Sequence, residues 1–166
     1  SLGTAICKIF ELDAASVGAS EKRLKQAGRE YLKTYIVPQS HASYYPGAQP
    51  MYMKLLFEKS GNILGAQIVG RDGVDKRIDV IATAIRGGMT VFDLAELELA
   101  YAPPYGSAKD PVNYAGFVAG NIINGVSMPV YPDALPENSV IVDVREPDEI
   151  ACGAFPESID IPLGLL

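Results

Sequence analysis

The stretch that decides the fold is MYMKLLFEK-SGN-ILGAQIVG, which runs from Met51 to Gly70. Residues 51–59 and residues 63–70 are rich in apolar and β-forming side chains, and Ser60-Gly61-Asn62 between them carries the glycine of a tight turn. Two such runs on either side of a short turn are typical of an antiparallel hairpin. We therefore predict a β-hairpin over these residues.

Helical periodicity replaces this pattern after the hairpin. Residues 74–86 place apolar side chains three or four positions apart, as one stripe of a helix does, at Val74, Ile78, Ile81 and Ile85. Asp72 stands where an N-cap would be, and Gly87-Gly88 ends the element. Thr90 then caps a predicted second helix through Leu99, and a third is predicted from Pro111 to Ile123, with proline in its first turn.

The residues before the hairpin add further strands. Thr4 to Leu12 is apolar and rich in β-branched side chains and predicts a strand, and so does the run over residues 31–37, which Pro38 ends. Between them, Ser20 to Ala27 predicts a short helix that Ser20 caps. Strands first and helices afterwards, without β–α alternation, predict an α+β fold in which helices pack on one side of an antiparallel sheet.

Charge changes sharply near residue 110. Residues 1–109 hold 13 Lys and Arg against 11 Asp and Glu, a balance of +2, whereas residues 110–166 hold one base against nine acids, a balance of −8. The proline-bearing stretch 126–136 lies nearby. We therefore expect a first domain over residues 1–126, a linker over 127–137, and a second unit over 138–166. The second unit begins with a predicted strand, Val140 to Val144, followed by a helical turn and another strand over residues 158–161, as an incomplete α/β segment would.

Composition excludes several function classes. A net charge of −6 argues against nucleic-acid or anionic-membrane partners, and no apolar run approaches the ~20 residues that cross a bilayer. Cys7 and Cys152 lie 145 positions apart and, with the one histidine, His41, cannot supply four zinc ligands. We expect Cys7 to be a small core residue, Cys152 to be incidental in a turn, and the protein to be cytoplasmic. No two glycines stand at positions i and i+2, so a G-x-G-x-x-G dinucleotide fingerprint is missing from these residues.

Two loops carry clustered tyrosines beside prolines. The first is HASYYPGA at residues 41–48 and the second is YAPPYGSAKDP at residues 101–111. Proline fixes its own φ, so these rings should sit on stiff loops. A phenol is protonated at neutral pH and can donate a hydrogen bond or a proton to a developing anion. The alternative is that the rings pack at a domain or subunit contact.

Five motifs, in this order along the chain, resemble one known family: Gly3–Phe10, Tyr44–Ala48, Gly65–Gly70, Gly73–Val80 and Tyr101–Asp110. Over residues 1–126 the chain resembles the C-terminal dimerisation (interface) domain of flavin- and pyridine-nucleotide-dependent disulfide reductases, in the branch of coenzyme A disulfide reductases and NADH oxidases. Residues 133–166, especially VDVRE at 142–146 and IDIPL at 159–163, resemble the start of a rhodanese domain. The first residues already read as a strand without an initiator Met and the last stop in mid-pattern, so we expect a piece of a longer protein.

The resemblance implies a homodimer in which tyrosines of one subunit reach the active site of the other. By position in the motifs these are Tyr45 and Tyr105, with Tyr44 as the alternative at the first position. They would hydrogen-bond or protonate the thiolate released from a coenzyme A disulfide or persulfide. FAD and NAD(P)H would serve the full-length enzyme, with none expected in this fragment.

The redox cysteine and the nucleotide-binding domains do not occur in these residues, and the rhodanese portion ends before its persulfide-cysteine loop would come. The resemblance therefore implies that this fragment alone is inactive as a reductase and as a sulfurtransferase. Two alternatives stay open: a fragment of an NADH oxidase, whose cysteine cycles through sulfenic acid, and a dimerisation module whose tyrosines only pack. NADH against NADPH, and disulfide against persulfide or oxygen as acceptor, also stay open.

Overall fold

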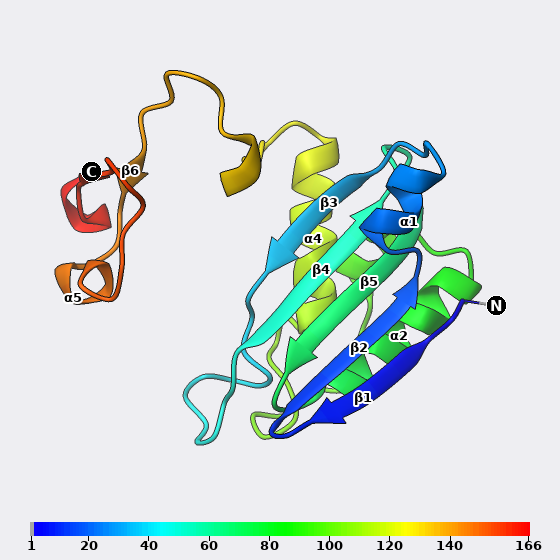
Figure 1. The fold of residues 1–166 in the computed structure, drawn as a ribbon. Coiled ribbons are helices and arrows are strands. Elements are labelled where there is room, and N and C mark those ends of the chain that lie inside the picture. Colours follow the sequence, from blue (N-terminus) through cyan, green and yellow to red (C-terminus); the bar gives the residue numbers. More distant parts are fainter. Residues whose placement is uncertain (1) are drawn as a thin grey trace. The chain divides into compact units, whose positions relative to one another are not determined.

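The computed structural model describes residues 2–166. The chain divides into two compact units, with the boundary along the sequence between Pro129 and Val130. The first unit is built on a five-stranded antiparallel sheet, drawn in Figure 1. Its strands stand in the order β1-β2-β5-β4-β3. Their bounds are Ala5–Ile9 for β1, Leu12–Gly18 for β2, Leu32–Ile36 for β3, Met51–Phe57 for β4 and Ile63–Gly70 for β5.

The predicted hairpin forms the middle of this sheet. β4 and β5 pair antiparallel, and the register sets Met53 opposite Ile68 and Leu55 opposite Ala66. All four of these side chains are buried, because alternate residues of both strands face the same side of the sheet. The hairpin prediction is therefore confirmed, and it supplies the sheet side of the core.

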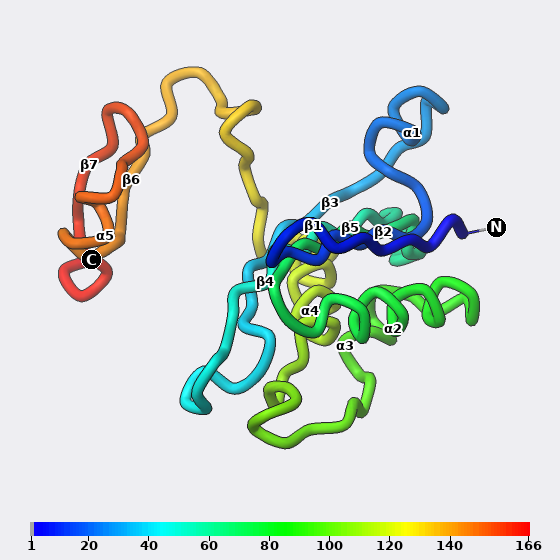
Figure 2. Tube along the Cα trace, turned by 60° about the horizontal axis from the view of Figure 1, so that its bottom comes forward, coloured from blue at the N-terminus to red at the C-terminus, as the bar shows by residue number. Residues whose placement is uncertain are grey.

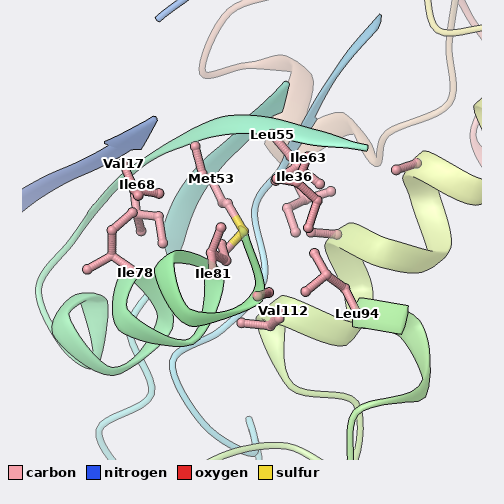
Figure 3. Packing of buried hydrophobic residues seen from close by; sticks show 14 of the residues in the cluster. Val17, Ile36, Met53, Leu55, Ile63, Ile68, Ile78, Ile81, Leu94 and Val112 are labelled. Atoms are coloured by element: carbon pink, nitrogen blue, oxygen red, sulfur yellow. The ribbon is translucent and has the colours of Figure 1, made fainter. Parts of the chain in front are cut away.

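The helices that follow the hairpin cover that face. They are α2 (Val74–Arg86), α3 (Val91–Glu96) and α4 (Pro111–Ile123), and Figure 2 shows all three on one side of the sheet. Figure 3 shows the resulting core, in which Ile78 and Ile81 of α2 and Val112 of α4 meet the apolar side chains of the sheet. The predicted α+β fold, with an antiparallel sheet and helices packed against it, is confirmed.

One short helix departs from this one-sided arrangement. α1 (Glu21–Gln26) lies on the opposite face, where its Leu24 packs against Leu56 and Leu64 in a small second cluster. Ser20 caps this helix as predicted, since its side chain accepts a hydrogen bond from the backbone N–H of Arg23.

Several local predictions were wrong. Thr4 to Leu12 is not one strand, because Phe10, at φ 52°, turns the chain from β1 into β2. Cys7 is exposed instead of buried, since β1 is an edge strand whose five residues are all exposed. The N-cap of α2 is Gly73, at φ 67°, and no side chain caps it, so Asp72 does not.

Helix α3 was also predicted too long. Its N-terminus has the predicted cap, because Thr90 and Asp93 form a reciprocal capping box. The helix nevertheless ends at Glu96 instead of Leu99, since Leu97 turns to extended backbone. The chain then enters the second tyrosine loop.

The second unit, residues 130–166, contains a small parallel pair of strands. β6 (Val142–Asp143) pairs with β7 (Ile159–Asp160), and α5 (Pro147–Ile150) lies between them in sequence. One 3-10 turn, Pro132–Ala134, precedes β6, and another, Leu163–Leu165, follows β7. Of the predicted strand Val140 to Val144, only Val142–Asp143 forms regular strand, although the Ile141 and Val144 carbonyls also accept backbone hydrogen bonds from Ile159 and Leu163. Cys152 is exposed. A parallel pair joined through a helix is an α/β arrangement.

Candidate active site

The first tyrosine loop is closed tightly at its base. It joins β3 to β4, and backbone hydrogen bonds link Met51 to Pro38 and Ser40 to Gln49, both with N···O distances of 2.8 Å. The Ser40 hydroxyl also accepts from the Gln49 N–H at 3.2 Å. Beyond this base, residues 43–47 are exposed and form the tip of the loop.

The second tyrosine loop runs from the end of α3 to the start of α4. A turn inside it is closed by the Tyr105 N–H, which donates to the Ala102 carbonyl at 2.8 Å. At its far end Asp110 caps α4 by accepting from the Val112 N–H at 3.1 Å. Asn113 then ties α4 back to the end of α3, because its side-chain amide donates to the Leu97 carbonyl at 2.9 Å.

The two loops contact each other directly. The Ala42 N–H donates to the Gly106 carbonyl at 2.9 Å, which joins the backbones. The hydroxyls of Tyr44 and Tyr101, 57 positions apart in sequence, lie 3.0 Å apart and share a hydrogen bond. That bond raises the pKa of Tyr44 above its ordinary value, because it stabilises the protonated phenol. The structure thus brings both predicted loops to one place.

Four tyrosines are displayed there. Tyr44 and Tyr105 are 75% and 72% exposed, and Tyr45 and Tyr101 are half-exposed. The Tyr45 ring packs edge-on against the buried ring of His41, with centroids 5.8 Å apart. Among residues 2–166, neither the Tyr45 nor the Tyr105 hydroxyl has a hydrogen-bond partner. Both hydroxyls are therefore available to an incoming acceptor.

Tyr101 is the residue of this cluster that the sequence analysis did not single out. It begins the same YAPPY motif as Tyr105, so the motif contained the signal, but nothing in the sequence showed that its hydroxyl meets that of Tyr44. His41 is buried, and its Nδ1–H donates to the Ala42 carbonyl at 3.2 Å.

A buried ion pair underlies both loops. Arg77 of α2 is 2% exposed and Asp110 is 3% exposed, and the Arg77 Nη2 donates to the Asp110 Oδ2 at 2.9 Å. The same nitrogen donates to the Ser40 carbonyl at 2.8 Å. One guanidinium therefore contacts the base of the first loop and the end of the second. Fork-like donation to a carboxylate and a carbonyl is what a guanidinium, but not an ammonium, can provide.

An open groove lies beside the loops. Ser43 of the first loop, Lys109 of the second, and Tyr114 and Val118 of α4 line it together with Val37. Aromatic side chains on α4 continue this surface, since Tyr114 and Phe117 are both exposed and the Lys109 ammonium lies 5.9 Å from the Phe117 ring centre. Exposed aromatic rings of this density are typical of protein interfaces.

Within residues 2–166, no group of three or more His, Cys, Asp or Glu side chains is placed to hold a metal ion. None of the helices in that range is long and apolar enough to cross a membrane.

The chain is similar to proteins of known family. The model of the pyridine nucleotide-disulphide oxidoreductase dimerisation domain matches residues 4–111. The coenzyme A disulfide reductase of Staphylococcus aureus (strain bovine RF122 / ET3-1) is 43% identical over 119 residues, which cover 71% of this chain and 27% of that protein. The chain therefore spans just over a quarter of the length of that relative.

Two solved structures match nearly the whole chain. The crystal structure of reduced Bacillus anthracis CoADR-RHD is 51% identical, with a TM-score of 0.94, over 99% of this chain and 30% of that one. A NAD-dependent persulfide reductase from A. fulgidus is 43% identical, with a TM-score of 0.89, over 98% of this chain and 30% of that one. The similarity to both structures extends through the second unit.

Proposed function

This chain belongs to the pyridine nucleotide-disulphide oxidoreductase dimerisation-domain family, and from this premise we propose that it is the dimerisation part of a flavin- and NAD(P)H-dependent coenzyme A disulfide or persulfide reductase. The observation that carries the proposal is the convergence of the two tyrosine loops, with the Tyr45 and Tyr105 hydroxyls open and without partners among residues 2–166. The identity of 43–51% to a coenzyme A disulfide reductase, CoADR-RHD and a persulfide reductase favours sulfur substrates.

We propose that the main binding sites for the flavin and the nicotinamide lie outside these residues. No glycine pair is spaced as in a dinucleotide fingerprint, and the groove beside the loops has no glycine-rich helix N-terminus. In the full-length enzyme the cofactors would supply two electrons as a hydride and a redox cysteine would use them, both outside this chain. The net reaction is NAD(P)H, a proton and a disulfide giving NAD(P)⁺ and two thiols.

The role proposed for this chain lies in the sulfur step. When a thiolate attacks one sulfur of the substrate, a new S–S bond forms to that sulfur, the old S–S bond breaks, and the other sulfur leaves with the electron pair of the broken bond. That sulfur leaves faster when its negative charge is stabilised. The Tyr45 and Tyr105 hydroxyls would donate hydrogen bonds to it, and a proton transferred from a phenol would be replaced from solvent. Both rings would act in the active site of the partner subunit of a homodimer.

The neighbouring Tyr44–Tyr101 pair strengthens this proposal. When one of these two hydroxyls donates a hydrogen bond to the other, the accepting hydroxyl is polarised. The O–H of that accepting tyrosine then becomes a stronger donor to a third group. Their shared hydrogen bond of 3.0 Å places such a donor at the same tip. Tyr44, the alternative to Tyr45, therefore belongs in the test together with Tyr101.

The division of the chain is part of the proposal. Residues 1–126 would form the dimerisation domain, 127–137 a linker, and 138–166 the start of a rhodanese-like domain. The boundary between the compact units after Pro129 supports the linker, and the parallel β6–β7 pair together with the nearly complete match to CoADR-RHD supports the last segment.

The decisive experiment replaces the tyrosines by phenylalanine in the full-length enzyme. Phe keeps the ring and deletes the hydroxyl, so packing is preserved. We expect Tyr45→Phe and Tyr105→Phe each to slow reduction of coenzyme A disulfide about 100-fold, the lower range of general acid catalysis. Flavin reduction by NAD(P)H, followed separately by stopped flow, should not change. Tyr52→Phe is the matched control, because Tyr52 is an exposed tyrosine on β4 that lies outside both loops.

Three outcomes separate the alternatives. Full disulfide turnover in every loop variant, the Tyr44 and Tyr101 variants included, would leave a dimerisation module without chemistry. Faster turnover with oxygen than with any sulfur substrate would favour an NADH oxidase. A strict monomer in light scattering over a range of concentrations would contradict the homodimer.

A further inference from the structure

We infer that Arg77 is a positioning residue for the tyrosine site: its buried guanidinium fixes the two tyrosine loops relative to each other. This inference rests on the proposed function, because it concerns how the proposed phenols are held. Among residues 2–166 the side-chain hydrogen bonds of Arg77 go to Ser40, Gly73 and Asp110 and not to a tyrosine hydroxyl, so its effect on catalysis must pass through the loops.

The contacts of the guanidinium define this role. Besides the Ser40 carbonyl and the Asp110 Oδ2, Arg77 donates from Nε to the Asp110 Oδ1 at 3.4 Å and from Nη1 to the Gly73 carbonyl at 3.3 Å. It therefore holds groups from the first loop, from the N-cap of α4 and from the N-cap of its own helix. These segments lie far apart in sequence and share no other buried cation within residues 2–166.

Two of these three contacts, those to Ser40 and Asp110, are close to a loop tyrosine along the chain. Ser40 stands four residues before Tyr44, and Asp110 stands five residues after Tyr105. Between the ion pair and the rings lies the Ala42–Gly106 backbone hydrogen bond, which keeps the loops together nearer their tips. A shift of the guanidinium therefore changes the separation of the loops at their base, and the phenols move with them.

The missing side chain of Gly73 leaves space for the Arg77 guanidinium. A Cβ at Gly73 would lie 2.1 Å from the Arg77 Nη1, and the residue has a φ of 67°, which favours glycine. This explains why glycine, not the predicted Asp72, forms the N-cap of α2. The helix begins with a residue that leaves room for a buried arginine.

Lysine at position 77 tests the geometry while it keeps the charge. An ammonium lacks the planar fork, so it cannot hold the carboxylate and the Ser40 carbonyl in the same arrangement. In the full-length holoenzyme we expect Arg77→Lys to lower kcat for coenzyme A disulfide about tenfold, since small misplacements of positioned groups are costly in rate. Flavin reduction by NAD(P)H should keep its wild-type rate. Arg86→Lys is the matched control, because Arg86 is exposed on the same helix.

A double-mutant cycle distinguishes positioning from general destabilisation. If Arg77 acts through the phenols, Arg77→Lys should have less than a twofold effect in an enzyme that already carries Tyr45→Phe and Tyr105→Phe. The same tenfold loss in both backgrounds would overturn the inference, and so would wild-type kcat in Arg77→Lys alone. If the two Phe substitutions themselves leave turnover unchanged, the proposed function fails, which is a separate result.

A second variant keeps the test valid if Arg77→Lys does not yield folded dimer. Arg77→Met with Asp110→Asn removes both buried charges together, so no buried charge is left unpaired, and asparagine still caps a helix well. Lys76, whose Nζ lies 4.0 Å from the Asp110 Oδ2, is partly exposed and stays hydrated without that partner. The same cycle is then run with this pair. We expect loss of kcat with retained flavin reduction, and equal losses with and without the tyrosines would overturn the inference.

Discussion

Two glycines on helix α4 should respond in opposite directions to the same substitution. A Cβ at Gly116 would lie 2.5 Å from the Ala95 nitrogen and 2.7 Å from the Val91 oxygen, both backbone atoms of α3. A Cβ at Gly120, one turn later, would meet only the Phe92 ring at 3.5 Å or more, which is ordinary contact. The first site is closed to a methyl group and the second is open.

The size of each effect follows from this geometry. At Gly116 the two helices would have to separate by about 1 Å, and such overpacking costs about 3 kcal/mol, from which the better helix propensity of alanine recovers about 1 kcal/mol. Gly116→Ala should therefore lower the free energy of unfolding by about 2 kcal/mol. Gly120→Ala should raise it by up to about 1 kcal/mol, because only the propensity changes.

Urea unfolding followed by far-UV circular dichroism measures both variants against the wild-type chain, at one protein concentration because dimerisation would add to stability. The transition midpoints should move in opposite directions while the m-values stay equal. In thermal unfolding we expect about −6 °C for Gly116→Ala and about +2 °C for Gly120→Ala. Equal stability of the two variants would refute the close packing of α3 on α4 described above.

Three further predictions concern other parts of the molecule. The pKa of Glu21 lies well below its ordinary value of 4.5, because its carboxylate accepts hydrogen bonds, first from Lys54 and then from the Tyr31 hydroxyl and Lys33. The ionised carboxylate therefore stabilises the fold above pH 4.5 and loses this contribution as the pH falls. Glu21→Gln should cost about 1 kcal/mol at pH 7 and progressively less below pH 4.5; a constant difference between pH 7 and pH 3 in urea unfolding would contradict this. Leu94→Ala should lower the free energy of unfolding by about 3 kcal/mol, because Leu94 is fully buried and leaves a cavity; a loss under 1 kcal/mol would show that the core collapses around it. Brief chymotrypsin treatment, read by mass spectrometry, should cut first within residues 126–137, which are exposed or half-buried, and a first cut inside β4 or β5 would oppose the linker.

The sequence predicted an element correctly where a cap or turn residue next to that element in sequence determines its position. Helix α4 has the predicted bounds, and its start is marked by two adjacent residues, the N-cap Asp110 and Pro111 in the first turn. The β4–β5 hairpin follows from a glycine-containing turn between apolar runs in the same way. In both cases the determining contacts lie within a few positions along the chain.

Predictions failed where the deciding contact is distant or unusual. The turn at Phe10 uses a positive φ at a residue that ordinarily avoids it, so nothing in the apolar run marked the break. The exposure of Cys7 depends on which strand lies at the edge of the sheet, which its own neighbours in sequence do not reveal.

In the candidate site, too, the local features were predicted and the long-range contacts were not. Its loops were predicted from their tyrosines and prolines, but the ion pair beneath them joins residues 33 positions apart and the Tyr44–Tyr101 bond joins residues 57 apart. The one available hint was that Arg77 falls on the apolar stripe of α2, three residues after Val74 and next to Ile78. A charged residue on a buried face needs a partner, and only the fold identified Asp110.

The shared support under the tyrosine loops has a consequence for protein engineering. Transplanting the two loops into a different protein would transfer the tyrosines without α2, whose Arg77 contacts the base of both loops. If Arg77 positions the loops as inferred, a working chimera has to bring Gly73 and Arg77 along with Asp110, and the smallest transferable module consists of three chain segments instead of two.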